Sequence, residues 1–251
     1  MTVHFIGAGP GAEDLLTVRA INLLKTSPLC LYAGSIIPKG ILAYCPPHGE
    51  CIDTAALSLT DLEHHFLRAH QEGKDIARLH SGDLSLYSAM AEQISVLNKH
   101  TIPYTITPGV PAFSATAAAL GCELTLPYKA QSLIITRLEG RASSMPESET
   151  LENFAQTKSV LAIHLAIHRI QEICERLIPF YGENCPAAVG AHVSWPQEKL
   201  LFSTLALLPQ AVQKANIERT ALILVGKNLH AEPVQTSSLY REDYHRRFKS
   251  A

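Results

Sequence analysis

Residues 3–11 read Val-His-Phe-Ile-Gly-Ala-Gly-Pro-Gly, a short apolar run that passes directly into three glycines. Such a run predicts a buried strand that ends in a tight turn. Similar runs then alternate with amphipathic stretches, which predicts a mostly parallel sheet covered by helices. The predicted strands are Val3–Ile6, Leu29–Tyr32, Ile76–Leu79 and Tyr104–Ile106, and the predicted helices are Leu15–Leu24, Leu62–His70, Ser85–Leu97 and Ala112–Leu120.

The pattern changes after Leu126-Pro127, where a predicted strand is followed by a polar stretch instead of a helix. Two runs that flank Trp195-Pro196 predict a hairpin or the edge of a mixed sheet. We therefore expect an α/β protein of two domains, 1–120 with a mostly parallel sheet and 121–251 with a mixed sheet, and a cleft between them. In the second domain the predicted strands are Ser132–Thr136, Val160–His164, Ala187–Val193, Lys199–Ser203 and Ala221–Val225, and the predicted helices are Glu147–Phe154, Arg169–Ile178 and Leu205–Lys214.

Composition excludes several classes of protein. The 251 residues include 21 Lys and Arg against 23 Asp and Glu, a net charge of −2, so no overall positive field favours nucleic acid. No apolar run approaches the ~20 residues of a membrane span. The 6 cysteines are scattered without a C-x-x-C pair, which favours a reducing cytoplasm. His164 and His168 lie across a predicted strand end and helix start, so we expect no metal site.

The run Gly7-Ala8-Gly9-Pro10-Gly11-Ala12 satisfies the dinucleotide-binding fingerprint if alanine takes the last position. Pro10 removes one backbone N–H from such a loop, and the second predicted strand ends in Leu31-Tyr32-Ala33 without an acidic residue to hold a ribose. A nicotinamide cofactor is therefore disfavoured. A tight turn that binds no ligand is the plain alternative.

Two further predicted strands end in similar runs. Arg78-Leu79-His80-Ser81-Gly82-Asp83 leads into a helix, where the carboxylate of Asp83 either binds a ligand or caps the helix. Pro108-Gly109-Val110-Pro111 leads into a helix of small residues. In parallel sheets ligands bind beyond the carboxyl ends of the strands, so the three runs together predict a binding site.

These runs resemble the tetrapyrrole (corrin and porphyrin) methylase family, and the resemblance covers nearly the whole chain. It is specific because many separate motifs occur in order. They are Phe5–Gly11 followed by Leu15-Leu16-Thr17, Tyr32-Ala33-Gly34-Ser35, Arg78–Asp83, Pro108-Gly109-Val110, Glu123-Leu124-Thr125, Thr136–Arg141, Ser194-Trp195-Pro196 with Glu198-Lys199, and the tail Ser238-Leu239-Tyr240 with Phe248.

The resemblance implies a homodimeric, cytoplasmic methyltransferase that takes a methyl group from S-adenosyl-L-methionine and releases S-adenosyl-L-homocysteine. It implies C-11 of precorrin-4, or of its cobalt form, in cobalamin biosynthesis as the acceptor, with another ring carbon as the alternative. No catalytic base is identified by it. The implied donor-binding residues are Pro10, Gly82, Asp83, Leu86, Pro111, Ala112, Leu165, Val193 and Ala221.

Two departures concern these residues, since the family usually has proline where this chain has Leu84 and often has serines where Pro111 and Ala112 stand. The tetrapyrrole acceptor carries several carboxylates, and guanidinium groups pair with carboxylates through two hydrogen bonds. Arg137 and Arg141 are the candidate substrate-binding residues, and ordinary surface arginines are the alternative. A ribosomal RNA methylase of the same fold is disfavoured by the near-neutral charge.

Overall fold

The computed structural model describes residues 1–140 and 144–229. Contacts divide it into two units. The first contains Met1–Ala115 and His192–Glu198, and the second contains Thr116–Ala191 and the chain from Lys199 onward. The division predicted from the sequence, at residue 120, lies a few residues further along the same helix, and the position of His192–Glu198 in the first unit is not predicted.

The first unit is built on a five-stranded sheet in the order β3-β2-β4-β1-β5. Every pair of neighbouring strands is parallel, as the alternation of strands and helices predicts. Because β1 lies between β4 and β5, the loops that follow these three strands are neighbours. The strands are β1 (Val3–Gly7), β2 (Leu29–Tyr32), β3 (Glu50–Asp53), β4 (Ile76–His80) and β5 (Tyr104–Thr107).

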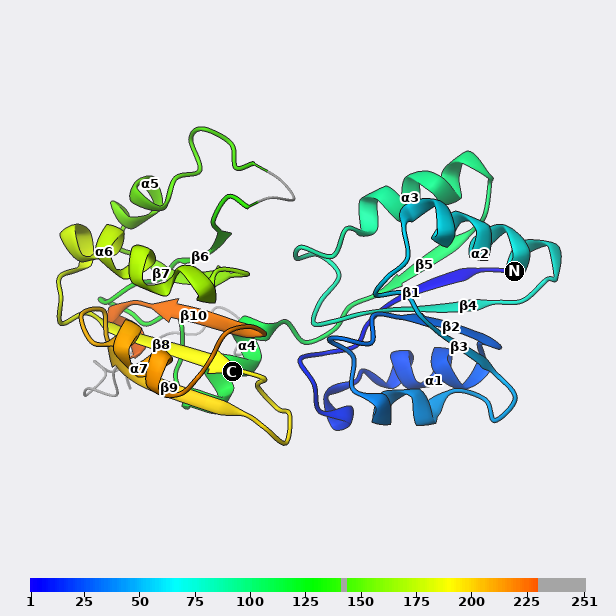
Figure 1. Ribbon diagram of the computed structural model, residues 1–251, viewed down its shortest axis with the longest axis horizontal. Coiled ribbons are helices and arrows are strands. Elements are labelled where there is room, and N and C mark those ends of the chain that lie inside the picture. Colours follow the sequence, from blue (N-terminus) through cyan, green and yellow to red (C-terminus); the bar gives the residue numbers. More distant parts are fainter. Residues whose placement is uncertain (141–143, 230–251) are drawn as a thin grey trace, which may run out of the picture. The chain divides into compact units, whose positions relative to one another are not determined.

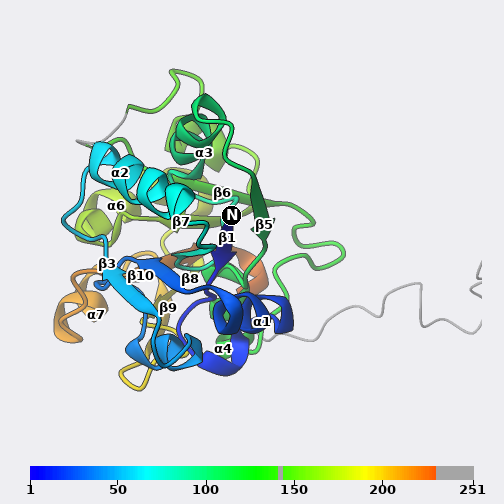
Figure 2. The same cartoon turned by 90° about the vertical axis from the view of Figure 1, so that its right-hand side faces the viewer.

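Helices cover both faces of this sheet (Figures 1 and 2). On one face α2 (Leu59–Gln71) and α3 (Met90–Lys99) pack against the core side chains of Phe5 and Leu31. On the other face α1 (Val18–Thr26) and the short 3-10 helix η2 (Lys39–Tyr44) enclose a second core. Both faces are therefore covered, which explains why the central strands β1, β2 and β4 are buried along almost their whole length.

The second unit has a mixed sheet in the order β6-β7-β10-β8-β9, in which only β6 and β7 pair in parallel. One core joins it to α5, α6 and α7. The predicted hairpin is confirmed as β8 and β9. The elements are α4 (Ala112–Leu120), which begins in the first unit, β6 (Leu133–Arg137), α5 (Leu151–Ala155), β7 (Val160–His164), α6 (Ile170–Tyr181), β8 (Pro186–Ala191), β9 (Lys199–Thr204), α7 (Leu208–Lys214) and β10 (Ala221–Val225).

Several predicted helix starts are wrong, and two of them have a clear local reason. The helix expected from Ser85 begins only at Met90, because Tyr87 and Ala89 have φ angles of 51° and 52°, which interrupt a helix. The first helix begins at Val18 instead of Leu15, because the side chain of Thr17 caps it by accepting from the N–H of Ala20. The helices expected from Glu147 and Leu205 begin at Leu151 and Leu208.

No helix among residues 1–140 and 144–229 combines the length and the apolar character that crossing a membrane requires.

Candidate functional site

Three loops meet at the carboxyl ends of β1, β4 and β5, and we call them the strand-end loops: Gly7–Ala12, Ser81–Leu86 and Pro108–Pro111. Gly9 and Gly82 exchange two backbone hydrogen bonds, with N···O distances of 3.2 Å and 2.7 Å. Both glycines have positive φ angles, 71° and 66°, which side chains disfavour. The first two loops are therefore joined through their backbones.

The third loop is packed onto the other two without side chains between them. A Cβ atom on Gly7 would lie 2.5 Å from the backbone nitrogen of Gly109, and one on Gly109 would lie 2.2 Å from the carbonyl oxygen of Gly82. Glycine is required at 7 and 109 because backbone lies where a methyl group would be. The sequence identifies these glycines but not this reason for them.

The carboxylate of Asp83 ties two of the loops together. Its Oδ2 accepts from the N–H of Gly109 at 2.9 Å, and its Oδ1 accepts from the N–H of Ser85 at 2.9 Å and from the Ser85 hydroxyl. Burial opposes its ionisation, but these hydrogen bonds and that of Leu84 lower its pKa below the ordinary value. Asp83 is thus an ionised side chain with acceptor capacity left on Oδ2.

The segment His192–Glu198 closes over the first loop. The indole N–H of Trp195 donates to the carbonyl of Pro10 at 2.8 Å, and the hydroxyl of Ser194 accepts from the N–H of Ala12 at 2.9 Å. A Cβ on Gly11 would lie 2.1 Å from the Trp195 ring. Trp195 belongs to the motifs that carry the family resemblance, but no spacing rule places it beside a residue 185 positions away.

These contacts argue against a dinucleotide phosphate site. The N–H groups of Ala8, Gly9 and Ala12 donate to the His80 carbonyl, the Gly82 carbonyl and the Ser194 hydroxyl, and Pro10 has no N–H. A phosphate cradle needs such amides to be available. The resemblance of this loop to the dinucleotide fingerprint is therefore confined to its sequence.

Most of the sequence-predicted donor-binding residues lie on the strand-end loops or next to them. They are Pro10, Gly82, Asp83 and Leu86, with Pro111 and Ala112 at the start of α4 and Val193 beside Ser194. The departure at Leu84 is accommodated, because its side chain is buried in the core that α2 and α3 cover. Pro111 precedes α4, and its carbonyl accepts from the N–H of Ala115.

The remaining candidates lie at the ends of neighbouring strands, on one side of the sheet in the second unit. Arg137, the last residue of β6, is in register with His164 at the end of β7. Leu165 follows directly, with a φ of 57° and an exposed side chain. Ala221 begins the neighbouring strand β10. Because β10 runs antiparallel to β7, its first residue lies next to the end of β7. Arg137, Leu165 and Ala221, which are far apart in sequence, therefore share one end of this sheet.

Arg137 is held by its own loop. Its Nη1 donates to the carbonyl of Leu138 at 3.0 Å, and its Nη2 donates to that of Ser144 at 3.1 Å. Arg141 lies outside the described residues.

Two buried basic side chains, Arg78 and His80, lie beneath the strand-end loops, and no role for them is predicted from the sequence. Arg78 donates to Gln93 and Thr54, each at 2.9 Å, and burial lowers its pKa to about 10. His80 is 8% exposed; burial, with the charge of Arg78, lowers its pKa to about 3. His80 is therefore neutral in the folded protein at any pH near neutrality.

Acid should destabilise the first unit through His80. An unfolded histidine takes up a proton below pH 6.5, whereas folded His80 does so only near pH 3, so stability is lost as the pH falls between these values. When the pH is lowered from 7 to 5, the free energy of unfolding should fall in both proteins. We expect this fall to be about 2 kcal/mol smaller in His80→Asn than in the parent protein. Urea unfolding at both pH values measures this difference. His48→Asn, at an exposed histidine, is the control and should follow the parent.

Three of the scattered cysteines lie together in the first unit. The sulfur atoms of Cys30, Cys45 and Cys51 all lie within 4.8 Å of one another. A hydrogen bond from Cys30 lowers the pKa of Cys45 to about 7, and burial followed by the charge of Cys45 raises that of Cys51 to about 11. The spacing of the cysteines in the sequence does not predict this cluster. Pairing of β2 with β3 brings Cys30 beside Cys51, and the connection between these strands brings Cys45 to them.

A family model described as Tetrapyrrole (Corrin/Porphyrin) Methylases matches residues 2–209. The chain is a member of the tetrapyrrole methylase family. The resemblance drawn from the sequence motifs and the α/β fold class, with its parallel and mixed sheets, are confirmed.

Individual relatives of this tetrapyrrole methylase cover more than nine tenths of its length. A precorrin-4 C(11)-methyltransferase of Sinorhizobium sp is 56% identical over 249 residues, which are 99% of this chain and 98% of that protein. The X-ray structure of a cobalt precorrin-4 methyltransferase, CbiF, has a TM-score of 0.89 at 34% identity and covers 91% of this chain and 96% of its own. A uroporphyrin-III C-methyltransferase of Thermus thermophilus, complexed with S-adenosylhomocysteine, shares the fold at a TM-score of 0.75 and 24% identity, over 92% and 94% of the two chains.

Proposed function

We propose that this tetrapyrrole methylase transfers a methyl group from S-adenosylmethionine to C-11 of precorrin-4 in cobalamin biosynthesis. The observation that carries the proposal is the 56% identity, over 249 residues, to a protein named for that reaction. The strand-end loops support it because they occur at the carboxyl ends of parallel strands, where ligands of such sheets bind.

The residues present fit a cationic donor. Asp83 is ionised and its Oδ2 has acceptor capacity beyond the bond from Gly109. A Cβ on Gly82 would have no atom nearer than 4.0 Å, so space adjoins the backbone there. Pro10, Leu86, Pro111, Ala112, Leu165, Val193 and Ala221 complete the proposed donor-binding set and contribute mainly apolar surface and backbone.

S-adenosylmethionine, when bound, supplies a methyl group already activated by a sulfonium. The chain then needs to supply alignment and the exclusion of water, which together are worth up to roughly 7 to 11 kcal/mol of barrier. No nucleophilic side chain is required. In this proposal Asp83 orients the donor, and the fixed backbone of the strand-end loops limits its movement.

The proposal is tested with isotopically labelled S-adenosylmethionine and with precorrin-4 in its metal-free and cobalt forms. A single labelled methyl group at C-11, located by carbon-resolved NMR and mass spectrometry, is the expected product. Methylation at another ring carbon identifies a sister reaction instead. Failure to bind the donor or its demethylated product in calorimetry, by protein that is folded, overturns the proposal entirely.

Arg137 and Arg141 are proposed to bind the acceptor carboxylates. Because hydrogen bonds between charged groups are worth about 1.5 to 3 kcal/mol, we expect Arg137→Ala to raise the KM for the tetrapyrrole about 10- to 100-fold. The Kd for S-adenosylmethionine should stay within twofold. Lys227→Ala, an exposed cation beyond the other end of β10, should change neither constant. Unchanged KM values in both Arg137→Ala and Arg141→Ala would exclude this role.

We further propose that the chain is a cytoplasmic homodimer, as the family resemblance implies. Light scattering of the purified protein should give twice the mass of one chain, and a monomer at micromolar concentration would contradict the dimer.

A further inference from the structure

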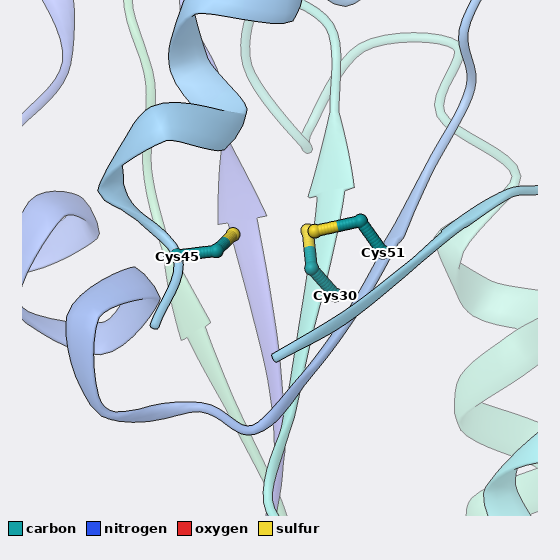
Figure 3. Close-up of side chains that lie close together, drawn as sticks. All are labelled: Cys30, Cys45 and Cys51. Atoms are coloured by element: carbon teal, nitrogen blue, oxygen red, sulfur yellow. The ribbon is translucent and has the colours of Figure 1, made fainter. Parts of the chain in front are cut away.

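The cluster of Cys30, Cys45 and Cys51 lies apart from the strand-end loops. Cys30 on β2 is the register partner of Cys51 on β3. It is also in register with Ala77, whose other partner is His4, three residues before Gly7. Figure 3 shows the side chain of Cys45 directed from the neighbouring loop toward the other two.

Backbone contacts, not the thiols, fix these positions. Cys45 ends η2, where its N–H donates to the carbonyl of Leu42 at 3.0 Å. A turn follows in which the N–H of Gly49 donates to Pro46 at 2.8 Å, and the N–H of Glu50 donates to Pro28 at 2.9 Å. The connection from β2 to β3 therefore presents three sulfur atoms at one place before any ligand binds them.

The cluster is accessible from one side. Cys30 is 1% exposed, in the core beneath α1, whereas Cys45 is half-buried and Cys51 is exposed at the outer strand. An ion can enter from the side of Cys51. The described residues place no histidine or carboxylate in this cluster, so its ligand atoms are sulfur alone.

Sulfur ligands select soft metal ions such as Cu⁺ and Zn²⁺ and reject Mg²⁺ and Ca²⁺. Zinc–sulfur bonds of about 2.3 Å at a tetrahedral centre require sulfur atoms about 3.8 Å apart. The three sulfur atoms lie within 4.8 Å of one another, so small side-chain rotations bring them to the separation that a tetrahedral zinc ion requires. Zn²⁺ would take a water as its fourth ligand, and Cu⁺ would be satisfied by the three sulfurs.

We propose that Cys30, Cys45 and Cys51 form a three-thiolate site for a soft d10 metal ion, Zn²⁺ or Cu⁺. Each thiol gives up its proton to solvent as its sulfur bonds to the ion. The bound ion joins β2, β3 and the end of η2, and so fastens the connection 33–49 to the sheet. This site is independent of the proposed methyl transfer, because it shares no residue with the strand-end loops.

The test is an anaerobic titration of the full chain after reduction with a phosphine, so that all 6 cysteines enter as thiols. Zn²⁺ is titrated against a chromophoric chelator, and Cu⁺ is titrated in a separate arm that records sulfur-to-metal charge-transfer absorption. We expect one ion per chain with a Kd below about 1 µM in at least one arm. At a hundredfold excess over Kd the unfolding temperature should rise by about 5 to 10 °C.

Single variants separate this site from adventitious thiol binding. Cys51→Ser, at an exposed position that leaves the core intact, should weaken binding about 100-fold or more, and Cys45→Ser should do the same. Cys122→Ser, which removes a half-buried thiol outside the cluster, should bind like the parent. Binding that is absent in both arms, or that survives unchanged in Cys51→Ser while circular dichroism shows a folded protein, would overturn the proposal.

Discussion

Replacing Gly109 by alanine is expected to abolish binding of the methyl donor and to destabilise the first unit by about 3 kcal/mol. The new Cβ would lie 2.2 Å from the Gly82 carbonyl oxygen and 2.8 Å from the carbonyl carbon of Gly7. Both neighbours are backbone atoms of strand-end loops, so neither can move aside as a flexible side chain would. The loops must separate, and the arrangement around Asp83 is lost with them.

Calorimetry with S-adenosylmethionine and urea unfolding followed by circular dichroism measure the two effects. Gly140→Ala is the matched control, because a Cβ there meets no atom of the described residues within 4 Å and its φ is not in the left-handed region. It should change stability by less than about 0.5 kcal/mol and leave donor binding intact. A Gly109→Ala protein that binds the donor within twofold of the parent would show that the close backbone packing has no bearing on the site.

The second large effect is expected for Asp83→Asn, which should raise the Kd of S-adenosylmethionine about 30- to 100-fold. An amide keeps one acceptor oxygen, so either Gly109 or Ser85 faces an NH₂ group in place of an oxygen. A buried donor left without an acceptor costs about 1 to 3 kcal/mol. The substitution also removes the negative charge that we propose faces a cationic donor.

Asp53→Asn is a close control for Asp83→Asn. Asp53 also holds a loop at a strand end, where its Oδ1 accepts from the N–H groups of Gly34 and Ala55 at 2.9 Å, and these bonds lower its pKa. Its substitution should affect donor binding less than threefold. Titration calorimetry at pH 7 compares the affinities of the two variants for S-adenosylmethionine. Equal losses of affinity would mean that Asp83 only positions its loop and does not contact the donor.

The elements predicted most accurately from the sequence are the buried ones. Three strands have the predicted bounds: Leu29–Tyr32, Val160–His164 and Ala221–Val225. A short apolar run bounded by polar residues indicates a buried strand. Glu50–Asp53 was missed. It is an outer strand with mainly exposed residues, so it lacks the apolar signal and depends on pairing with β2.

The candidate site was predicted in part. Glycines and Asp83 at the ends of strands indicate a site because topology brings such ends together. The contact of Trp195 with Pro10 and the meeting of Cys30, Cys45 and Cys51 depend on tertiary structure, and local spacing holds no information about either. The buried state of His80 was also missed, because the sequence does not show which helices cover β4.

The close backbone packing at Gly7 and Gly109 has a consequence for efforts to redirect this catalyst toward other macrocycles. Positions that tolerate no side chain offer nothing for laboratory evolution to vary, and libraries that randomise them would consist largely of inactive proteins. Diversity is better introduced at residue 137, at the end of β6, which we propose contacts the acceptor. Under the proposed roles, the choice of acceptor can then be varied at residue 137 while the glycines of the strand-end loops stay unchanged.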